Sequence, residues 1–261
     1  MIDFTRTYVF GDSLFGAERG ENLPADKRRD FGRAAPYLVF DRMAPDTGGF
    51  YTNLAVPGLT SRAVELQVER YAKEIRDATA VFLECGLNDF GIDSKRPIAP
   101  NMSEYARGMN RIADAASDRI VSAIKNCCHK FPRNTTVFLF TLPSFTVLQP
   151  KSWTPTPQEQ ANADTHIAFV NQGLTALCNS QPERIRLVDF GGWYSAVLRD
   201  PPFIGGVQMR GFPQFGGGHF VTVDGIHPGA FSQGLLANVI LRLCGAGEKC
   251  LSDSELLGLW K

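Results

Sequence analysis

Three residues from opposite ends of the chain could together form a serine nucleophile and its base. Ser13 closes the segment Val9-Phe10-Gly11-Asp12-Ser13, where an apolar run stops abruptly. A serine hydroxyl becomes an effective nucleophile when a histidine removes its proton and an acid orients that histidine. His227 follows Asp224 in Asp224-Gly225-Ile226-His227-Pro228, a turn tight enough for the carboxylate to reach one imidazole nitrogen. The other nitrogen could then face Ser13.

Each of these residues also has a purely structural interpretation. Serine and aspartate are common at helix N-termini, so Ser13 could cap a helix and Asp224 could precede one. The remaining histidines are weaker candidates for a base. His129 and His166 fall within helical patterns, where surface or packing roles are usual, and His219 follows three glycines as a lesser alternative.

Acyl transfer also needs hydrogen-bond donors for the negative oxygen of the tetrahedral intermediate. Gly58 could offer an unobstructed backbone N–H, and Asn88 in Gly86-Leu87-Asn88-Asp89 a side-chain amide. In isolation, each would be an ordinary turn residue. Together with Ser13 and the Asp224–His227 pair, they favour a catalytic arrangement.

The elements that must position these residues alternate between strands and helices. Strand patterns cover 8–10, 50–56, 80–85, 136–141 and 184–190, and helical spacing covers 36–43, 61–76, 103–130, 157–180 and 229–244. This alternation predicts a parallel sheet covered by helices on both faces. Ligands of such sheets bind beyond the carboxyl ends of the strands, where Ser13, Gly58 and Asn88 fall.

Composition excludes several classes of partner. A chain of 261 residues that is 44% hydrophobic can bury a substantial core, and we expect one domain over 1–261. Its 27 basic residues balance 27 acidic ones, which argues against nucleic acid or an anionic membrane as partner. No apolar run approaches the roughly 20 residues of a membrane span. A small neutral substrate is the natural expectation.

Six cysteines are present, without a CxxC pair, so neither a metal site nor a cofactor is expected. The even number permits disulfides, and Cys244 with Cys250 would close a short loop. Two glycosylation sequons, Asn101-Met102-Ser103 and Asn134-Thr135-Thr136, favour a secreted protein over a cytoplasmic one, although the chain as given begins without an apolar signal segment.

The candidate residues fall in four blocks that resemble those of the GDSL lipase/esterase family, the SGNH hydrolases. In family order, the blocks are Phe10-Gly11-Asp12-Ser13-Leu14, Asn53-Leu54-Ala55-Val56-Pro57-Gly58, Gly86-Leu87-Asn88-Asp89 and Asp224-Gly225-Ile226-His227-Pro228. The resemblance implies a flavodoxin-like, three-layer α/β/α fold with about five parallel strands. It also implies that Ser13 is the nucleophile, His227 the base and Asp224 its orienting acid. The oxyanion hole would comprise the Ser13 N–H, the Gly58 N–H and the Asn88 amide.

The chain departs from the family directly after the first block, where Phe15-Gly16-Ala17 replaces an Asp-x-Gly-Asn run. This departure concerns substrate contacts and not the nucleophile. We expect substrate to contact Asp12, Leu14 and Phe15, together with Phe212 and Phe215 from a Gly- and Pro-rich segment, 200–218, that could form a lid.

The favoured function is therefore hydrolysis of a carboxylic ester through an acyl-enzyme. Lipid, aryl and acylated-sugar esters all fit the apolar residues of the 200–218 segment. Two alternatives remain open: acyl transfer to an alcohol from the same acyl-enzyme, and a non-catalytic binding protein on the same fold. The sequence gives no expectation for the oligomeric state.

Overall fold

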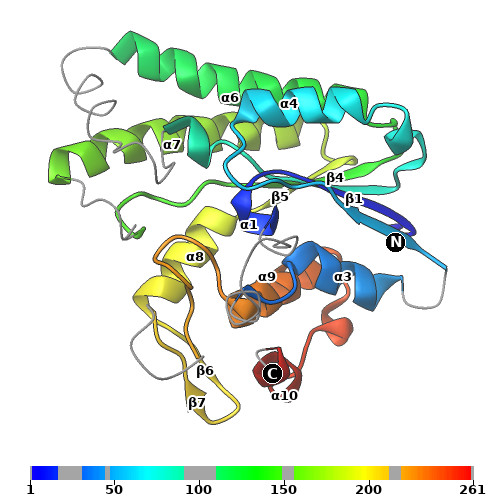
Figure 1. Ribbon diagram of the computed structural model, residues 1–261, viewed down its shortest axis with the longest axis vertical. Coiled ribbons are helices and arrows are strands. Elements are labelled where there is room, and N and C mark those ends of the chain that lie inside the picture. Colours follow the sequence, from blue (N-terminus) through cyan, green and yellow to red (C-terminus); the bar gives the residue numbers. More distant parts are fainter. Residues whose placement is uncertain are drawn as a thin grey trace.

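The computed structural model describes residues 2–16, 31–44, 48–90, 110–148, 156–211 and 219–259. Its centre is a five-stranded sheet in the order β2-β1-β3-β4-β5, in which every neighbouring pair is parallel. The strands are β1 (Arg6–Phe10), β2 (Phe50–Asn53), β3 (Ala80–Leu83), β4 (Thr136–Phe140) and β5 (Ile185–Val188). This arrangement confirms the predicted α/β fold (Figure 1).

The central strands β1, β3 and β4 are largely apolar runs because helices cover both faces of the sheet. All four residues of β3 are buried, as are the last four of β1. In the register, Val9 of β1 lies opposite Asn53 of β2 on one side and Phe82 of β3 on the other. The exit of β1 therefore lies between those of β2 and β3, which positions the residue after each strand at one edge.

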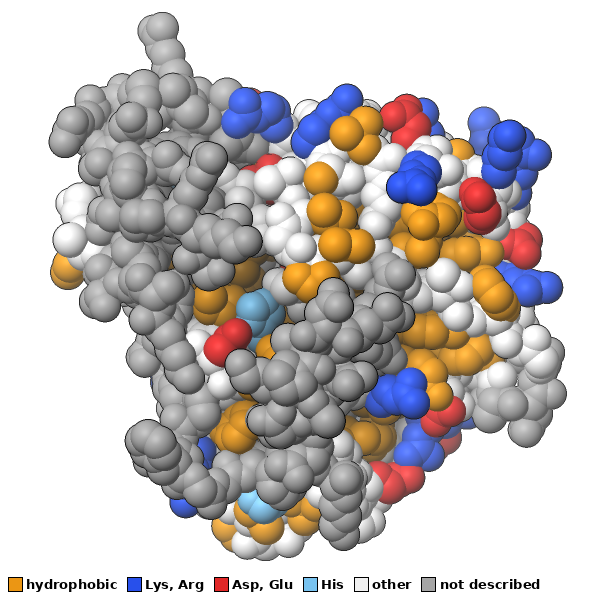
Figure 2. All heavy atoms as spheres, in the orientation of Figure 1, with side chains coloured by type: hydrophobic (Ala, Val, Ile, Leu, Met, Phe, Trp, Pro, Cys, Tyr) orange, Lys and Arg blue, Asp and Glu red, His pale blue; other side chains and the backbone are white. Residues whose placement is uncertain are grey.

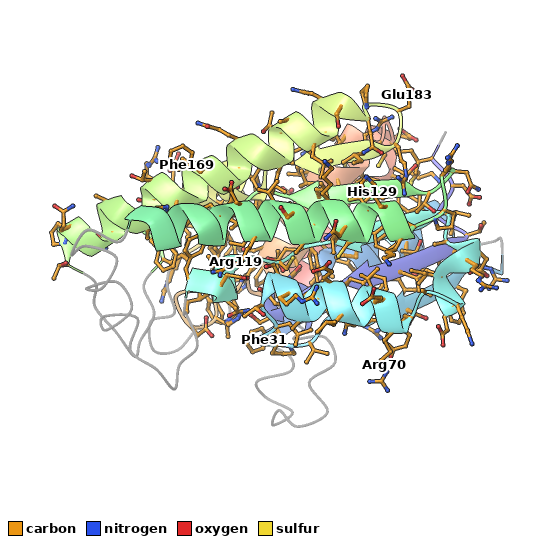
Figure 3. All side chains as sticks on the ribbon, turned by 90° about the horizontal axis from the view of Figure 1, so that it is seen from above. Phe31, Arg70, Arg119, His129, Phe169 and Glu183 are labelled. Atoms are coloured by element: carbon orange, nitrogen blue, oxygen red, sulfur yellow. The ribbon has the colours of Figure 1, made fainter. Side chains whose placement is uncertain are left out.

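One face of the sheet is covered by α4 (Ser61–Arg70), α6 (Asn110–Lys130) and α7 (Pro157–Ser180). Seen from above, α6 lies between the other two helices (Figure 3). Their buried side chains, which include Val64, Ile120 and Val170, pack with those of β3 and β4 in one core. At Gly173 the helices α6 and α7 come close together, since a Cβ there would lie 2.6 Å from Val121 Cγ2.

The opposite face is covered by α3 (Ala35–Met43), α8 (Phe190–Arg199) and α9 (Ala230–Leu243), with α10 (Asp253–Gly258) outside them (Figure 1). Stacked rings of Phe82 and Phe138, with centroids 4.8 Å apart, form part of this second core. Helix α9 is apolar around most of its circumference and is almost entirely buried, as expected for a helix enclosed by the fold.

Several predicted boundaries were wrong. The helix expected over 61–76 ends at Arg70, and a short 3₁₀ helix, η2 (Glu74–Asp77), follows. Its N-cap is Thr60, whose side chain accepts a hydrogen bond from Ala63 N. The strand expected over 184–190 ends at Val188, because Asp189 accepts a hydrogen bond from Gly192 N and so begins α8.

The segment 200–218 is not simply a loop. A two-stranded antiparallel hairpin, β6 (Phe203–Ile204) and β7 (Val207–Gln208), occupies its first half and lies at the periphery in Figure 1. Residues 212–218, including the predicted substrate contacts Phe212 and Phe215, lie outside the described residues. The same holds for 103–109 of the predicted long helix and for the sequon at 101–103.

Where Figure 2 shows side chains in colour, basic and acidic groups are interspersed, mostly along the top and right of the view. This distribution agrees with equal numbers of basic and acidic residues. All six cysteines are free, so the structure does not contain the disulfide considered for Cys244 and Cys250. Among the described residues, no helix combines the length and apolarity needed to cross a bilayer.

Candidate active site

The exit of β1 places Ser13 at the start of a short helix. Gly11 has a φ of 153°, and a Cβ at this position would lie only 2.4 Å from Glu84 O, so the chain needs glycine here. Helix α1 (Ser13–Gly16) begins immediately afterwards. Asp12, and not Ser13, has the capping role, because its Oδ1 accepts a hydrogen bond of 3.1 Å from Leu14 N. The Ser13 side chain is therefore not needed as a cap.

The structure brings Asp224 and His227 together in the turn before α9. His227 Nδ1 lies 2.7 Å from Asp224 Oδ2. The other carboxylate oxygen, Oδ1, accepts backbone hydrogen bonds from His227 N at 2.8 Å and Ile226 N at 3.0 Å. This three-bond arrangement fixes the plane of the carboxylate, and it leaves Nε2 as the imidazole nitrogen available for chemistry.

The pair has the electrostatics of a base supported by an anion. Burial alone lowers the pKa of His227, but the hydrogen bond and charge of Asp224 outweigh it, so the pKa lies above its ordinary value. For Asp224, burial raises the pKa, yet hydrogen bonds and the charge of His227 bring it down to about 2. Asp224 is therefore an anion at neutral pH, and the imidazolium form of His227 is stabilised.

Buried groups from two other elements hold this turn. Thr222 Oγ1 donates to His227 O at 2.8 Å and accepts from Gly225 N at 3.0 Å. The hydroxyl of Tyr194, a fully buried residue of α8, donates to Ile226 O at 3.0 Å. The ring of Phe31 meets the His227 ring edge to face, with centroids 5.9 Å apart. The sequence analysis missed these three supports.

The charge of Asp12 also acts on His227 and raises its pKa, so the turn and the exit of β1 lie near one another. Among the described residues, no hydrogen bond joins the Ser13 hydroxyl to the His227 ring. Catalytic hydrogen bonds are often long or poorly aligned without substrate and tighten in its complex.

Gly58 lies beside the exit of β1 with a free backbone donor. Val56 N donates to Gly11 O at 3.0 Å, and Asn53 binds Phe15 O through its Nδ2 at 2.9 Å, so this segment is tied to both ends of the nucleophile turn. Gly58 has a φ of 84°, and a Cβ there would meet nothing within 4 Å. Its N–H has no partner among the described residues. The Ser13 N–H, at the first position of α1, likewise lacks a helical partner.

Asn88 lies in the 3₁₀ helix η3 (Leu87–Phe90), after β3. Its Nδ2 donates to Asp12 Oδ2 at 2.8 Å and to Leu59 O at 3.0 Å. An amide nitrogen carries two hydrogens, so both are engaged in this structure. One of these bonds must be released or shared if Asn88 is to bind an oxyanion.

Beside Asp12 lies a second buried carboxyl that sequence analysis overlooked. Glu84 follows β3 and is 4% exposed, and the charge of Asp12 acts on its carboxyl. A signal for it was available, since an acidic residue directly after the buried run Ala80–Leu83 is unusual.

Two other predicted contacts do not agree with the structure. Phe15 is fully buried and packs edge to face on Phe140, with ring centroids 5.0 Å apart, and Leu14 is 6% exposed. Both belong to the hydrophobic core, so neither side chain lines an open substrate surface. The alternative base His219 instead packs its ring against Phe231, with centroids 5.3 Å apart.

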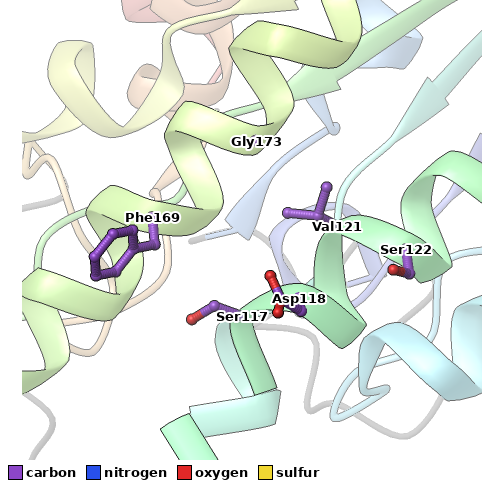
Figure 4. Close-up of a pocket in the computed structure, with 6 residues that line it drawn as sticks. All are labelled: Ser117, Asp118, Val121, Ser122, Phe169 and Gly173. Atoms are coloured by element: carbon purple, nitrogen blue, oxygen red, sulfur yellow. The ribbon is translucent and has the colours of Figure 1, made fainter. Parts of the chain in front are cut away.

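A groove of about 600 Å³ lies away from this site, between α6 and α7. Figure 4 shows the six residues that line it: Ser117, Asp118, Val121, Ser122, Phe169 and Gly173. None of them is a predicted site residue. Within the described part of the chain, no group of three or more histidine, cysteine, aspartate or glutamate side chains could hold a metal ion.

The parallel five-stranded sheet between two helical layers, with an acid–histidine pair near its carboxyl edge, is the architecture of a three-layer α/β/α hydrolase. The sequence profile of the family described as GDSL-like Lipase/Acylhydrolase matches residues 8–240. The chain belongs to this family, as the four sequence blocks predicted.

Solved structures with the same fold include a lipase from a goat rumen metagenome. It has a TM-score of 0.61 at 15% identity, with 94% of this chain and 99% of that chain covered. An acetylxylan esterase from Geobacillus stearothermophilus has a TM-score of 0.54 at 16% identity, covering 92% and 94% of the two chains. A lipolytic G-D-S-L family protein from Veillonella parvula gives 0.53 at 18%, covering 91% and 96%.

At these identities the likeness establishes the fold. Among curated proteins, none matches the chain.

Proposed function

We propose that the protein hydrolyses carboxylic esters through a covalent acyl-enzyme on Ser13. The observation that carries the proposal is the 2.7 Å contact between His227 Nδ1 and Asp224 Oδ2 in a turn close enough to Asp12 to sense its charge. Because this contact occupies Nδ1, Nε2 is the nitrogen left to accept a proton from the neighbouring serine hydroxyl.

In the first half-reaction, Ser13 Oγ attacks the ester carbonyl carbon while His227 Nε2 takes the hydroxyl proton. The carbonyl oxygen becomes an oxyanion, for which the N–H groups of Ser13 and Gly58 are free donors and Asn88 is a third candidate. The tetrahedral intermediate then collapses, the bond to the alcohol oxygen breaks, and the alcohol leaves with the proton from His227.

In the second half-reaction, His227 Nε2 removes a proton from water, and the resulting hydroxide attacks the acyl carbon of the Ser13 ester. Collapse of the second intermediate releases the carboxylic acid and returns the proton to Ser13 Oγ. The charge of Asp224 stabilises the imidazolium that forms in each half-reaction.

The substrate class we propose is an ester of a small or apolar acid. Two proteins with this fold, a lipase and an acetylxylan esterase, support lipid and acetylated-sugar esters as the first classes to test. A panel of p-nitrophenyl esters of increasing acyl length, together with acetylated xylan, would separate them.

The test of the mechanism is Ser13→Ala, with Ser254→Ala on the exposed part of α10 as the matched control. We expect turnover of p-nitrophenyl acetate to fall by several orders of magnitude in Ser13→Ala and to stay unchanged in the control. Labelling of Ser13 by a fluorophosphonate, located by mass spectrometry, is the second expected result. Undiminished turnover in Ser13→Ala would refute the proposal.

The same assay separates the two alternative functions. Acyl transfer would give an ester of a competing alcohol as the main product, whereas hydrolysis gives the free acid. A non-catalytic binding protein would show neither turnover nor labelling of Ser13 while remaining folded.

A further inference from the structure

Glu84 has an acidic side chain that is buried in the protein interior. It is 4% exposed, and its Oε2 is buried without a hydrogen-bond partner. It lies under the nucleophile turn, since a Cβ added to Gly11 would fall 3.4 Å from Glu84 Oε2. Asp12, the next residue of that turn, is 3% exposed. Two carboxyls thus lie together beneath Ser13, and the acyl-transfer steps above use neither.

This pair is expected to hold one proton, and the proton belongs to Glu84. Burial raises the pKa of the Glu84 carboxyl well above its ordinary value, and the adjacent charge of Asp12 raises it further. Burial also leaves the pKa of Asp12 raised, but less than that of Glu84, because hydrogen bonds from Glu84 and from Leu14 N oppose the effect of burial. We therefore take Asp12 as the carboxylate of the pair. Leu14 N donates to its Oδ1 and Asn88 Nδ2 to its Oδ2, and a protonated Glu84 would be a third donor.

We propose that Glu84 is a positioning residue of the oxyanion hole: its carboxyl donates a hydrogen bond to Asp12, and the Asp12 carboxylate holds the Asn88 amide beside Ser13. The inference rests on the proposed esterase function. Nothing in the reaction requires Glu84 to touch substrate. Its effect is transmitted through the 2.8 Å contact between Asp12 Oδ2 and Asn88 Nδ2.

The two hydrogens of Asn88 explain why this contact matters. One is bound to Asp12 and the other to Leu59 O at 3.0 Å. The bond to Leu59 is between neutral groups and is the weaker of the two, so it is the one that can be given up to an oxyanion. The bond to Asp12 then keeps the amide in the plane required for donation.

Loss of the Glu84 donor would turn Asp12 from a hydrogen-bond acceptor into a hydrogen-bond donor. An Asp12 carboxylate that stays buried with one donor fewer takes up a proton itself, and a protonated Asp12 competes with Asn88 as a donor. Other titratable groups around the pair are His227 in the turn before α9, Asp89 in η3 and Cys85 next to Glu84, with Arg119 of α6 acting on Asp89. Of these, His227 would respond most clearly, because the charge of Asp12 raises its pKa.

The experiment compares Glu84→Leu, which has no donor, with Glu84→Gln, whose amide can still donate to Asp12. Exposed Glu183 provides the matched control, Glu183→Leu. We expect Glu84→Leu to lower kcat by about 10- to 100-fold with little change in KM, since the loss of an entire oxyanion donor lowers kcat by roughly 100- to 1,000-fold. Glu84→Gln should retain most of the kcat. The acid limb of the pH profile should move to lower pH in Glu84→Leu alone.

A double-mutant cycle tests the path through Asn88. In an Asn88→Ala background, Glu84→Leu should cause little further loss of kcat, because the group through which it acts is already absent. Equal losses in both backgrounds would overturn the proposal, as would wild-type kcat in a folded Glu84→Leu. If Ser13→Ala abolishes turnover but the Glu84 variants do not behave as expected, the esterase function is supported and only the proposed role of Glu84 is rejected.

Should Glu84→Leu not fold, the isosteric Glu84→Gln keeps the proposal testable. Difference infrared spectroscopy against wild type at neutral pH should then show the C=O stretch of a protonated carboxylic acid, lost in Glu84→Gln. Absence of that band from the wild-type protein would contradict the arrangement.

Discussion

Replacing Asp224 by asparagine should change which nitrogen of His227 carries its proton. In the wild-type protein, Oδ1 of Asp224 accepts two backbone N–H groups and Oδ2 faces His227 Nδ1. An asparagine has one acceptor oxygen, and the two backbone donors require it at the Oδ1 position. The amide nitrogen must then face Nδ1, which becomes an acceptor, so the proton moves to Nε2 and the ring can no longer act as a base toward Ser13.

The expected loss in kcat/KM is about 10³- to 10⁴-fold, equivalent to about 4 to 5.5 kcal/mol of transition-state stabilisation. We place the range below the largest losses known for such acids because the Asp224 side chain is 38% exposed, so water solvates part of its charge. The acid limb of the remaining activity should also move to lower pH, since the anion that raises the His227 pKa is gone.

The assay is hydrolysis of p-nitrophenyl acetate across the pH range, with Asp118→Asn on the exposed face of α6 as the matched control. Nitrogen chemical shifts of the His227 ring would report the tautomer directly, and circular dichroism would confirm that the variant folds. Less than a tenfold loss in a folded Asp224→Asn protein, or an Nδ1-protonated ring in that variant, would refute the argument from the geometry of the carboxylate.

Three further results follow from the same geometry. Tyr194→Phe removes the donor to Ile226 O from a fully buried position, which should lower the free energy of unfolding in urea by about 1 to 2 kcal/mol and kcat by less than about tenfold, because Thr222 still holds the turn. Gly58→Ala should lower kcat more than it raises KM. A φ of 84° is strained for alanine by about 1 kcal/mol or more, and relief of that strain would rotate the N–H of residue 58 away from the oxyanion. An unchanged kcat would show that the Gly58 N–H is not part of the oxyanion hole. The difference in unfolding free energy between wild type and Asp224→Asn should be largest between about pH 4 and 6.5. The lowered pKa of Asp224 stabilises the fold at pH values above the pKa of aspartate in the unfolded chain, and the raised pKa of His227 stabilises it at pH values below the pKa of histidine in the unfolded chain. A difference independent of pH would contradict this linkage.

The sequence predicted the centre of the sheet well because β1, β3 and β4 are buried on both faces. Runs such as Ala80–Leu83 and Thr136–Phe140 are almost wholly apolar, and Gly86 and Pro143 follow them three residues later. The strand exits carry Ser13, Gly58 and Asn88, so once the sheet was known to be parallel, their common edge followed. The helical layers were also largely predictable where the apolar spacing was regular, as in α6 and α7.

Helix α8 shows what local patterns could not reveal. Its first turn contains Gly191 and Gly192, which lower helix propensity, and no helix was predicted after the strand expected over 184–190. The structure explains both residues by close packing: a Cβ at Gly191 would lie 2.2 Å from Leu142 O, and one at Gly192 would lie 2.3 Å from Asp189 Oδ2. Tertiary contacts determine this helix, and with it the position of Tyr194. By contrast, α10 had a readable start, the capping box of Ser252 and Glu255.

The supports of the site were the least predictable part because most of them join residues far apart in the chain, as Tyr194 does with Ile226. Ser13 lies near the N-terminus and His227 lies in the turn before α9, so their relative position depends on how α9 meets α1. The buried side chain of Gln233 makes that connection, donating from Nε2 to Leu14 O at 2.9 Å and accepting at Oε1 from Ala35 N at 2.9 Å. One amide from α9 thus ties the helix that begins at Ser13 to the start of α3. A buried glutamine in a largely apolar helix is conspicuous in the sequence, but only the fold identifies the two backbone groups that it satisfies.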